Sequence, residues 1–484
     1  MARASFALFL LLTLFLPLRL RLSTARRWDT LQYAANQAAP SGYSSGQDYV
    51  SAMFDKALDL GMTTYRIFIQ GTGTGGVLKS DGSYDETLLV ALDWLIDLAN
   101  EKGVRLVITL NNLWKSDGVP LFEELCGTAS DNFKPDPEID PRTEETLNAT
   151  ERIQTPYSWF KSDTCREQYG AYMEAVFTRV NTVSGTQYLD DGAIFAWNIL
   201  NEPRCKYCGD TVVGDWYKYA FKHARSVGVN QLLTTGEEGF FGGGNDYSSY
   251  DPNDGSLWAY YSGQHFQYDH TYADFAVIHI WPSNWAIGSS KVVSFTRDWI
   301  EQHADAADGL GKPLVIEEFG IGVDTAADIS AVRDPMFSIA FGSVVGGSVA
   351  VSGVSAADIS NTDAVQGALV WYWTGLTWRT TDNDILSTDS TMADIIAPYS
   401  AAWAAYAGDG NATAAASPRS TVSAPSPSAA TSGAVSAQSI GSARPKAYPS
   451  LLTSAAPAPA ASAATTAGRR LFSSDNNAYI AKSR

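Results

Sequence analysis

Two glutamates follow apolar segments of the sequence and lie among residue types that bind or polarise a substrate. Glu202 comes just after the run AIFAWNIL (193–200), and Glu318 lies within PLVIEEFG (313–320). For a single glutamate, a helix N-cap or a salt bridge to a neighbour would be the simpler explanation. Two such carboxyls accompanied by Arg, Asn, His and several Trp residues instead indicate an active site with acid–base chemistry.

The chemistry that requires two carboxyls is glycoside hydrolysis. One carboxyl must hold a proton for the leaving oxygen, and the other must be ionised to attack the anomeric carbon or to activate water against it. Tryptophan supports this hypothesis because sugars stack their apolar faces on indole rings, and the chain has 14 tryptophans. Most of them belong in the core of any large barrel, but five fall at or just after expected strand ends: Trp114, Trp281, Trp285, Trp371 and Trp373.

The elements that would position these residues are short apolar runs alternating with longer amphipathic stretches. Because the runs are apolar almost throughout, they predict a parallel sheet that is covered by helices on both faces. About seven such units between residues 28 and 408 predict an α/β fold of the (β/α)8 TIM-barrel type, with a doubly wound sheet as the alternative. The expected strands are 63–69, 105–111, 193–200, 231–236, 275–281, 313–320 and 368–373.

The two ends of the chain differ in composition from this region. In residues 1–25 an arginine precedes an apolar stretch, and the small residues Ser23, Thr24 and Ala25 follow, which predicts a cleaved signal peptide. Residues 409–484 are rich in Ala, Ser, Thr and Pro, which predicts a disordered tail. We therefore expect a secreted protein, extracellular or in the cell wall, that is free of the membrane after signal cleavage.

The net charge of the chain indicates which class of molecule it binds. The net charge of −18 disfavours nucleic acid as a partner and favours a neutral one, although a merely solubilising acidic surface is the simpler explanation.

Four cysteines in a secreted chain predict two disulfides. The short spacing suits a bridge between Cys205 and Cys208, which leaves Cys126 and Cys165 as the second pair. The cysteines and the five histidines lack zinc-ligand spacing, so we expect no metal.

Other motifs give weaker signals. GTGTGG (71–76) fits a dinucleotide fingerprint, but no helix opens on its last glycine, so a substrate-side loop is favoured. The acidic segment 136–151 lacks the spacing of a calcium loop. Asn148 and Asn411 begin possible N-glycosylation sequons.

Five segments, in order along the chain, resemble glycoside hydrolase family 5 and most closely its endo-β-1,4-mannanases: YLDDGAIFAWNILNEPRC, LLTTGEEGFFG, DFAVIHIWPSNW, KPLVIEEFG and GALVWYW. The resemblance covers about residues 48–405. It implies that Glu202 is the acid/base, that Glu318 is the nucleophile, and that cleavage retains anomeric configuration without a cofactor. Glu317 is one residue off and is expected to face the other way on its strand.

The resemblance also implies a set of substrate-binding residues. Arg204 matches a mannan-binding arginine on the leaving-group side, and Trp371 matches the stacking platform at the cleavage site. The disulfide Cys205–Cys208 matches a small bridge in fungal-type members. The full set of substrate-binding candidates is Arg66, Asn112, Trp114, Asn201, Arg204, His279, Trp281, Trp285 and Trp371.

Two departures from the family pattern bear on activity. The opening strand is not recognisable in TARRWDTLQYAANQAAP, so it is either missing or degenerate. Trp281 stands where the family has a tyrosine that hydrogen-bonds the nucleophile, although an indole N–H is also a donor. We expect a secreted, monomeric endo-β-1,4-mannanase acting on mannan, glucomannan or galactomannan. The alternatives are another β-glycanase of the family, such as a cellulase, and a catalytically weak wall-binding protein.

Overall fold

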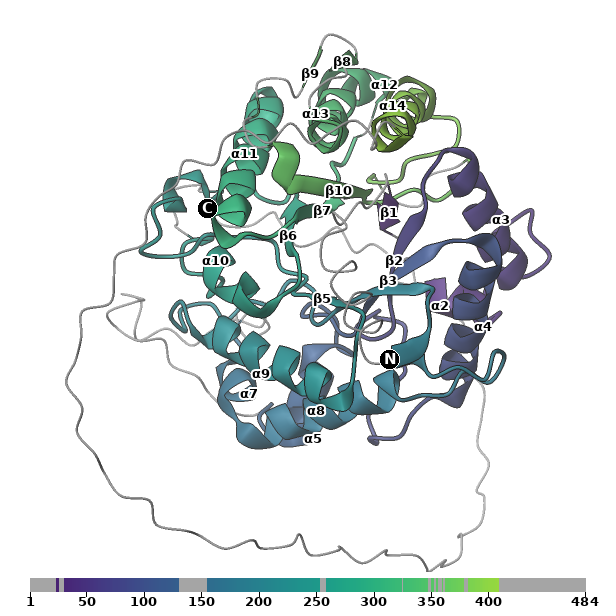
Figure 1. Ribbon diagram of the computed structural model, residues 1–484, viewed down its shortest axis with the longest axis vertical. Helices are drawn as coiled ribbons and strands as arrows, with labels where there is room; N and C mark the ends of the chain where they lie inside the picture. Colours follow the sequence, from purple (N-terminus) through teal and green to yellow (C-terminus); the bar gives the residue numbers. More distant parts are fainter. Residues whose placement is uncertain are drawn as a thin grey trace, which may run out of the picture. The chain divides into compact units, whose positions relative to one another are not determined.

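Eight parallel strands form the central sheet (Figure 1), and their order is that of a closed barrel. Neighbours in the sheet follow the order β5-β4-β3-β2-β1-β10-β7-β6. A backbone hydrogen bond also joins β5 to the segment just before β6, since the Asp274 amide donates to the Leu233 carbonyl at 2.8 Å. The predicted (β/α)8 barrel is confirmed. Its strands are β1 (Ser23–Ala25), β2 (Thr64–Phe68), β3 (Arg105–Thr109), β4 (Ile194–Asn198), β5 (Leu232–Thr234), β6 (Ala276–Ile280), β7 (Leu314–Phe319) and β10 (Val365–Val370).

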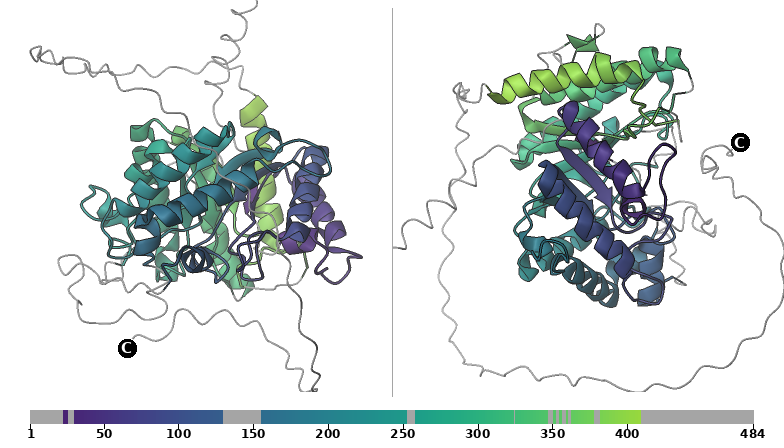
Figure 2. Two further views of the ribbon diagram at one scale, coloured as in Figure 1. Left: turned by 90° about the horizontal axis from the view of Figure 1, so that it is seen from below. Right: turned by 90° about the vertical axis from the view of Figure 1, so that its right-hand side faces the viewer.

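Helices surround the strands as an outer layer (Figure 2). In α4, for example, the Asp85 carboxylate accepts from the Leu88 amide at the N-terminus, and Gly103 ends the helix at φ 71°. A short antiparallel pair, β8 (Ala350–Val351) and β9 (Val354–Ser355), lies outside the barrel sheet. The helices are α2 (Thr30–Ala34), α3 (Gly46–Asp59), α4 (Glu86–Lys102), α5 (Val119–Cys126), α7 (Tyr157–Lys161), α8 (Asp163–Phe177), α9 (Val212–Val227), α10 (Phe266–Asp269), α11 (Val292–Leu310), α12 (Ala326–Asp328), α13 (Asp334–Val344) and α14 (Ala397–Gly408).

The first strand of the barrel is degenerate rather than missing. Strand β1 has three residues and pairs in parallel with β10 on one side and β2 on the other. Its register sets Thr24 beside Val370 and Ala25 beside Arg66. The residues that form it are the small residues of the expected cleavage site, so this segment both resembles a leader end and fills the first barrel position.

This computed structural model describes residues 23–25, 30–129, 155–252, 258–323 and 325–408, the last range with gaps at 347–349, 352–353, 356–358, 360–361 and 378–381. The expected leader before Ser23, the tail 409–484, the acidic segment 136–151 and both sequons lie outside the described residues. Within the described part of the chain, no helix has the length and apolar character needed to cross a membrane.

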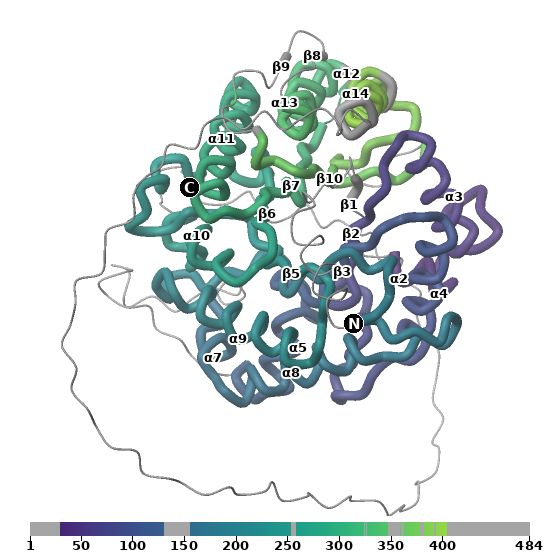
Figure 3. Tube along the Cα trace, in the orientation of Figure 1, coloured from purple at the N-terminus to yellow at the C-terminus, as the bar shows by residue number. Residues whose placement is uncertain are grey.

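The early and late parts of the barrel lie side by side (Figure 3). The Tyr49 hydroxyl of α3 donates to the Thr374 carbonyl beyond β10 at 2.9 Å, and Lys56 donates to Gly375 at 3.0 Å. Segments more than 300 residues apart are thereby held together where the ring closes.

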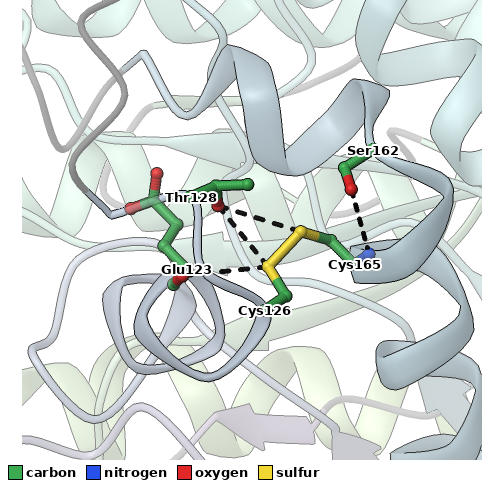
Figure 4. Close-up of a disulfide and its surroundings, with 5 residues drawn as sticks. All are labelled: Glu123, Cys126, Thr128, Ser162 and Cys165. Carbon is green, nitrogen blue, oxygen red and sulfur yellow. Dashed lines mark hydrogen bonds between the residues drawn. A yellow bond between two sulfur atoms is a disulfide. The ribbon is translucent and has the colours of Figure 1, made fainter.

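Both expected disulfides are bonded in the structure. Cys126 at the end of α5 is joined to Cys165 in α8, with the Thr128 hydroxyl 3.4 Å from the Cys126 sulfur (Figure 4). The second bridge, Cys205–Cys208, lies in the loop that follows Glu202. One disulfide therefore ties two outer helices, and the other constrains a loop at the carboxyl end of β4.

Candidate active site

The two predicted catalytic glutamates meet around one histidine at the carboxyl ends of the strands. Glu202 lies four residues beyond β4, Glu318 lies near the end of β7, and His279 lies on β6. The Nδ1 atom of His279 is 2.7 Å from Glu202 Oε1 and 3.6 Å from Glu318 Oε2. One ligand atom from each of the three residues lies within 4.8 Å of the others. The barrel thus gathers side chains that are 39 to 116 residues apart in the sequence.

Glu318 is surrounded by donors that favour a fixed, ionised carboxylate. Arg66 on β2 donates to Oε1 through Nη1, and Trp281 donates to Oε2 through its indole N–H at 3.2 Å. Arg66 is itself oriented by Asn201, whose Oδ1 accepts from Nη2 at 2.7 Å. The indole of Trp281 therefore donates to the carboxylate for which the family uses a tyrosine hydroxyl.

Glu202 has different donors and is more accessible. It accepts from His279 and, at 2.5 Å, from the indole N–H of Trp114. Its side chain is 13% exposed, against 5% for Glu318. Glu202 also has φ 48°, the left-handed region that a non-glycine residue enters at a cost, and such positions cluster at functional sites. Glu202 is therefore the more accessible of the two carboxyls.

Glu317 does not point away from the site as the strand alternation predicts. The pairing of β6 with β7 is irregular at this point, since Ile278 is opposite Ile316 but His279 is opposite Glu318. A β-bulge of this kind re-aims a side chain. Glu317 is buried inside the barrel, 3.4 Å from Arg66 Nε and 3.5 Å from His279 Nε2, and it accepts from Asn198 at 2.7 Å. It therefore helps to hold the same arginine and histidine that contact Glu318.

The pKa directions in the ligand-free site run against the expected division of roles. Burial opposes ionisation of Glu202, but the bond from His279, the charge of Arg204 and the bond from Trp114 outweigh it and lower the Glu202 pKa. For Glu318, burial and the charge of Glu202 outweigh His279 and Arg66 and raise the pKa. Although burial works against the charged form of His279, its carboxylate neighbours raise the pKa to about 10. The carboxyls of Glu202, Glu317 and Glu318 thus face the cations Arg66 and His279. This arrangement favours one proton shared between Glu202 and Glu318.

A metal ion is not required by this donor set. Glu202, His279 and Glu318 could in principle ligate one ion. The neighbouring carboxylates raise the His279 pKa to about 10, so an ion would have to displace a proton from this ring. Arg66 already neutralises part of the carboxylate charge. The arrangement fits proton transfer better than metal binding.

Arg204 is held at the side of the site nearest Glu202. Its guanidinium forms a bidentate pair with the buried carboxylate of Glu238, with one bond of 2.7 Å to Nε. The ring of Trp114 lies 4.9 Å from the guanidinium carbon, and the ring of Trp258 lies 5.0 Å from it. Glu238 lies in the segment GEEG (236–239), but no local pattern there marks it as the partner of Arg204.

The remaining predicted substrate-binding residues are Asn112, Trp371 and Trp285, and each contacts a neighbour of the site or of the core. Asn112 supports Asn201, because its Oδ1 accepts from Asn201 Nδ2 at 3.0 Å. The ring of Trp371 lies edge-on to that of Trp281, with centroids 6.2 Å apart. Trp285 is 3% exposed, and its ring packs against Phe240 and Trp299. A role for Trp285 in sugar binding stays a prediction.

A (β/α)8 barrel with two facing carboxyls at its strand ends defines a protein of the glycoside hydrolase class. The chain belongs to the family described as GH family 5 beta-mannosidase-like, whose model matches residues 50–397.

Curated relatives and solved structures are consistent with this family. The chain is 31% identical over 336 residues to mannan endo-1,4-beta-mannosidase 2 of Oryza sativa subsp. japonica, covering 66% of this chain and 67% of that one. It is 32% identical over 280 residues to mannan endo-1,4-beta-mannosidase 4 of the same organism, covering 56% and 55%. The matches thus span from about half to two thirds of these relatives' length.

The fold is shared with bacterial and fungal structures. An endo-1,4-beta-mannanase from Rhizomucor miehei superposes with a TM-score of 0.60 at 20% identity, covering 80% of this chain and 95% of that one. An endo-beta-1,4-mannanase from Thermotoga petrophila gives a TM-score of 0.59 at 20% identity, covering 80% and 77%. At these identities the comparison shows the barrel alone.

Proposed function

We propose that the protein is a retaining endo-β-1,4-mannanase that acts on mannan, glucomannan or galactomannan. The observation that carries the proposal is the pair Glu202 and Glu318, whose nearest ligand atoms lie within 4.8 Å of each other and of His279. A carboxyl separation of about 5–5.5 Å is that of retaining enzymes, whereas inverting enzymes need a wider gap for a water molecule.

In the first step, the Glu318 carboxylate attacks the anomeric carbon while Glu202 protonates the departing glycosidic oxygen. This forms a glycosyl ester on Glu318 and releases the leaving chain. In the second step, Glu202 takes a proton from water, which attacks the same carbon and frees Glu318. Both proton transfers and the nucleophile come from carboxyls of the chain, so the reaction calls for no cofactor.

The proton must reside on Glu202 when the sugar is bound. In the ligand-free site the pKa order favours Glu318 as its holder, because the bonds from His279 and Trp114 and the charge of Arg204 stabilise Glu202 as an anion. The Nδ1 atom of His279 contacts Glu202 at 2.7 Å and is 3.6 Å from Glu318. We infer that a sugar between the carboxyls shifts the shared proton to Glu202, with His279 adjacent to both.

The substrate assignment has separate support. The relatives named above carry the name mannan endo-1,4-beta-mannosidase, and Arg204 lies beside Glu202, where the resemblance expects a mannan-binding arginine. The apolar N-terminal stretch supports secretion, and the acidic net charge of −18 suits a neutral polysaccharide rather than nucleic acid. We propose that the protein acts as a secreted monomer, extracellular or in the cell wall.

The test is release of reducing ends from mannan, glucomannan, carboxymethylcellulose and xylan by the parent and by Glu318→Gln. Glu318→Gln is nearly isosteric and cannot form the ester. We expect release from the two mannans that is lost in Glu318→Gln, with a falling viscosity that shows internal cleavage. Release mainly from carboxymethylcellulose would favour the cellulase alternative. Binding to mannan without release would favour the wall-binding alternative.

A further inference from the structure

The short segment that follows β5 holds two groups of the catalytic site through its backbone. The Gly236 carbonyl accepts from the Glu202 amide at 2.7 Å, and the Glu238 carbonyl accepts from the His279 amide at 3.0 Å. Gly236 has φ 92°, and a Cβ added there would clash with the side chain of Asn198. The position of this segment therefore sets the position of Glu202 and of the histidine beside it.

Glu237, in the middle of this segment, is buried against a second acid, Asp269 of α10. Glu237 is 0% exposed and Asp269 is 1% exposed, and their carboxyls lie within hydrogen-bond reach of each other. Among the described residues, neither oxygen of Glu237 nor Oδ1 of Asp269 has a hydrogen-bond donor. Since an ionised carboxylate only accepts, the two groups can bond each other only if one of them is protonated. The pair therefore carries at least one proton.

His270, which follows α10, contacts the pair but supplies no positive charge. Its Nδ1 atom is 3.0 Å from Glu237 Oε1 and 2.8 Å from the Phe266 carbonyl oxygen. The Val277 amide donates to Nε2 at 3.1 Å, so that nitrogen carries no proton. Burial lowers the His270 pKa to about 4, which keeps the ring neutral above that pH. An ionised pair would thus gain no charge compensation from this ring.

Burial is the main influence on both acids. It raises the pKa of Glu237 to about 8 and also raises that of Asp269, which the charge of Glu237 raises further. A Cβ added to Gly214 would lie 2.5 Å from Asp269 Oδ1, so α9 packs directly against this carboxyl. The titratable groups that face the pair are Tyr217 of α9, His270, His279 of β6 and the neighbouring Glu238, while Glu317 of β7 and Lys312 act on His270.

We propose that Glu237 and Asp269 are positioning residues for the acid/base, as a protonated carboxyl pair that fixes the segment bonded to Glu202. While it holds its protons, the pair is a neutral, hydrogen-bonded unit that can stay buried beside the barrel. Each proton lost to solvent places a negative charge in this buried position, and the segment must shift to hydrate it. This inference rests on the proposed function, since it assumes that Glu202 is the acid/base.

The experiment follows kcat against pH on a dinitrophenyl β-mannobioside, whose leaving group needs no proton. Glu202 then acts only as the base of the second step, and its ionised form persists at alkaline pH. The parent kcat should fall as pH rises above about 8, where Glu237 ionises, and before His279 loses its proton near 10. In Glu237→Gln the amide keeps the shape of the protonated acid and can donate to Asp269, so kcat should stay level to about pH 9.

Two further variants separate positioning from general packing. Glu237→Ala removes the bond to Asp269 and should lower kcat roughly tenfold near neutral pH. Its KM should change little, because a buried side chain does not touch the sugar, and Glu237→Gln should restore the parent kcat. The matched control is Asp334→Asn, which removes another buried carboxyl whose pKa burial raises, one that lies on α13 and bonds Thr391. Its kcat should fall over the same alkaline range as that of the parent.

Failure of the inference is distinct from failure of the proposed function. A parent that cleaves mannan, with Glu237→Gln losing kcat over the same pH range, overturns the carboxyl pair alone. So does an Asp334→Asn variant that keeps its kcat to the same pH as Glu237→Gln, because the loss would then report stability in general. A parent that cleaves only cellulose overturns the proposed substrate, and the same pH series is then run on the aryl cellobioside. A parent that cleaves neither polymer overturns both.

Discussion

Glu202 and Glu318 have different partners, so their removal should impair different steps. Glu318→Ala removes the nucleophile and should lower turnover roughly a thousandfold or more on every substrate. Glu202→Ala should still form the glycosyl ester from an aryl mannoside, whose leaving group needs no proton, and then stall. Azide needs no general base and should rescue Glu202→Ala with a β-mannosyl azide as product, read by NMR. A β-azide from Glu318→Ala instead would reverse the roles, and an α-configured product from the parent would exclude retention.

Trp281 should replace the expected tyrosine through its indole donor, which lies 3.2 Å from Glu318. Trp281→Tyr keeps a donor and should retain or raise kcat on mannan. Trp281→Phe keeps a ring but removes the donor and should lower kcat roughly tenfold. Trp281→Ala should lose more activity, since it also removes the contact with Trp371. Parent-like activity in Trp281→Ala would place Trp281 outside the site.

His279 should stabilise the fold in a pH-dependent way. Its pKa is raised from 6.5 to about 10, so the folded state binds this proton more tightly than the unfolded state. The stabilisation is complete below pH 6.5 and is lost as pH rises through 10. The melting temperature of the parent minus that of His279→Gln should therefore be largest near pH 6 and shrink by pH 10.

The control for this pH series is His303→Gln. Burial lowers the pKa of His303 to about 4. The folded state therefore disfavours the protonated ring, and His303 lowers the stability of the fold as pH falls from 6.5 to 4. The difference between the parent and His303→Gln should vary between pH 6.5 and 4 and stay flat above. A His279→Gln difference that is flat up to pH 10 would contradict the raised pKa.

At the level of elements, β1 is the vulnerable strand. It has three residues, and it separates β2, which carries Arg66, from β10. Deleting residues 1–25 removes it and exposes unpaired strand edges, so we expect a melting temperature several degrees lower and reduced turnover. Deleting residues 1–22 keeps β1 and serves as the control. Equal stability of the two truncations would show that β1 contributes nothing to the barrel.

The same strand bears on processing of the predicted leader. A cut after Ala25 would remove the residues that pair with Leu369, Val370, Tyr65 and Arg66. N-terminal sequencing of the secreted protein locates the cut. The truncation pair above then shows what a cut on either side of Ser23–Ala25 does to activity.

For the whole molecule, the central region should carry all of the catalysis. Every described site residue lies between Arg66 and Trp371, and the tail from residue 409 has a composition that supports no packed core. Truncation after Gly408 should leave turnover on soluble mannan unchanged within about twofold. A tenfold loss would mean that the tail completes the site or the barrel.

The sequence by itself determined the barrel class, the two catalytic candidates and the disulfide pairs. These follow from local signals: apolar runs of strand length, the NEPR and EEFG segments, and the cysteine spacing. The resemblance to the family added Trp281 as the substitute donor. Each depends on residues that are close in the chain or on a motif that carries its own context.

The tertiary structure alone decided the position of Glu317, the partner of Arg204, the packing of Trp285 and the first strand. A bulge between β6 and β7 turned Glu317 inward, and closure of the barrel brought Ser23–Ala25 between β2 and β10. The pKa order of the catalytic pair likewise depends on charges gathered from four different strands and the loops after them. Such through-space contacts join residues far apart in the chain, and no local pattern encodes which of the possible partners each side chain meets.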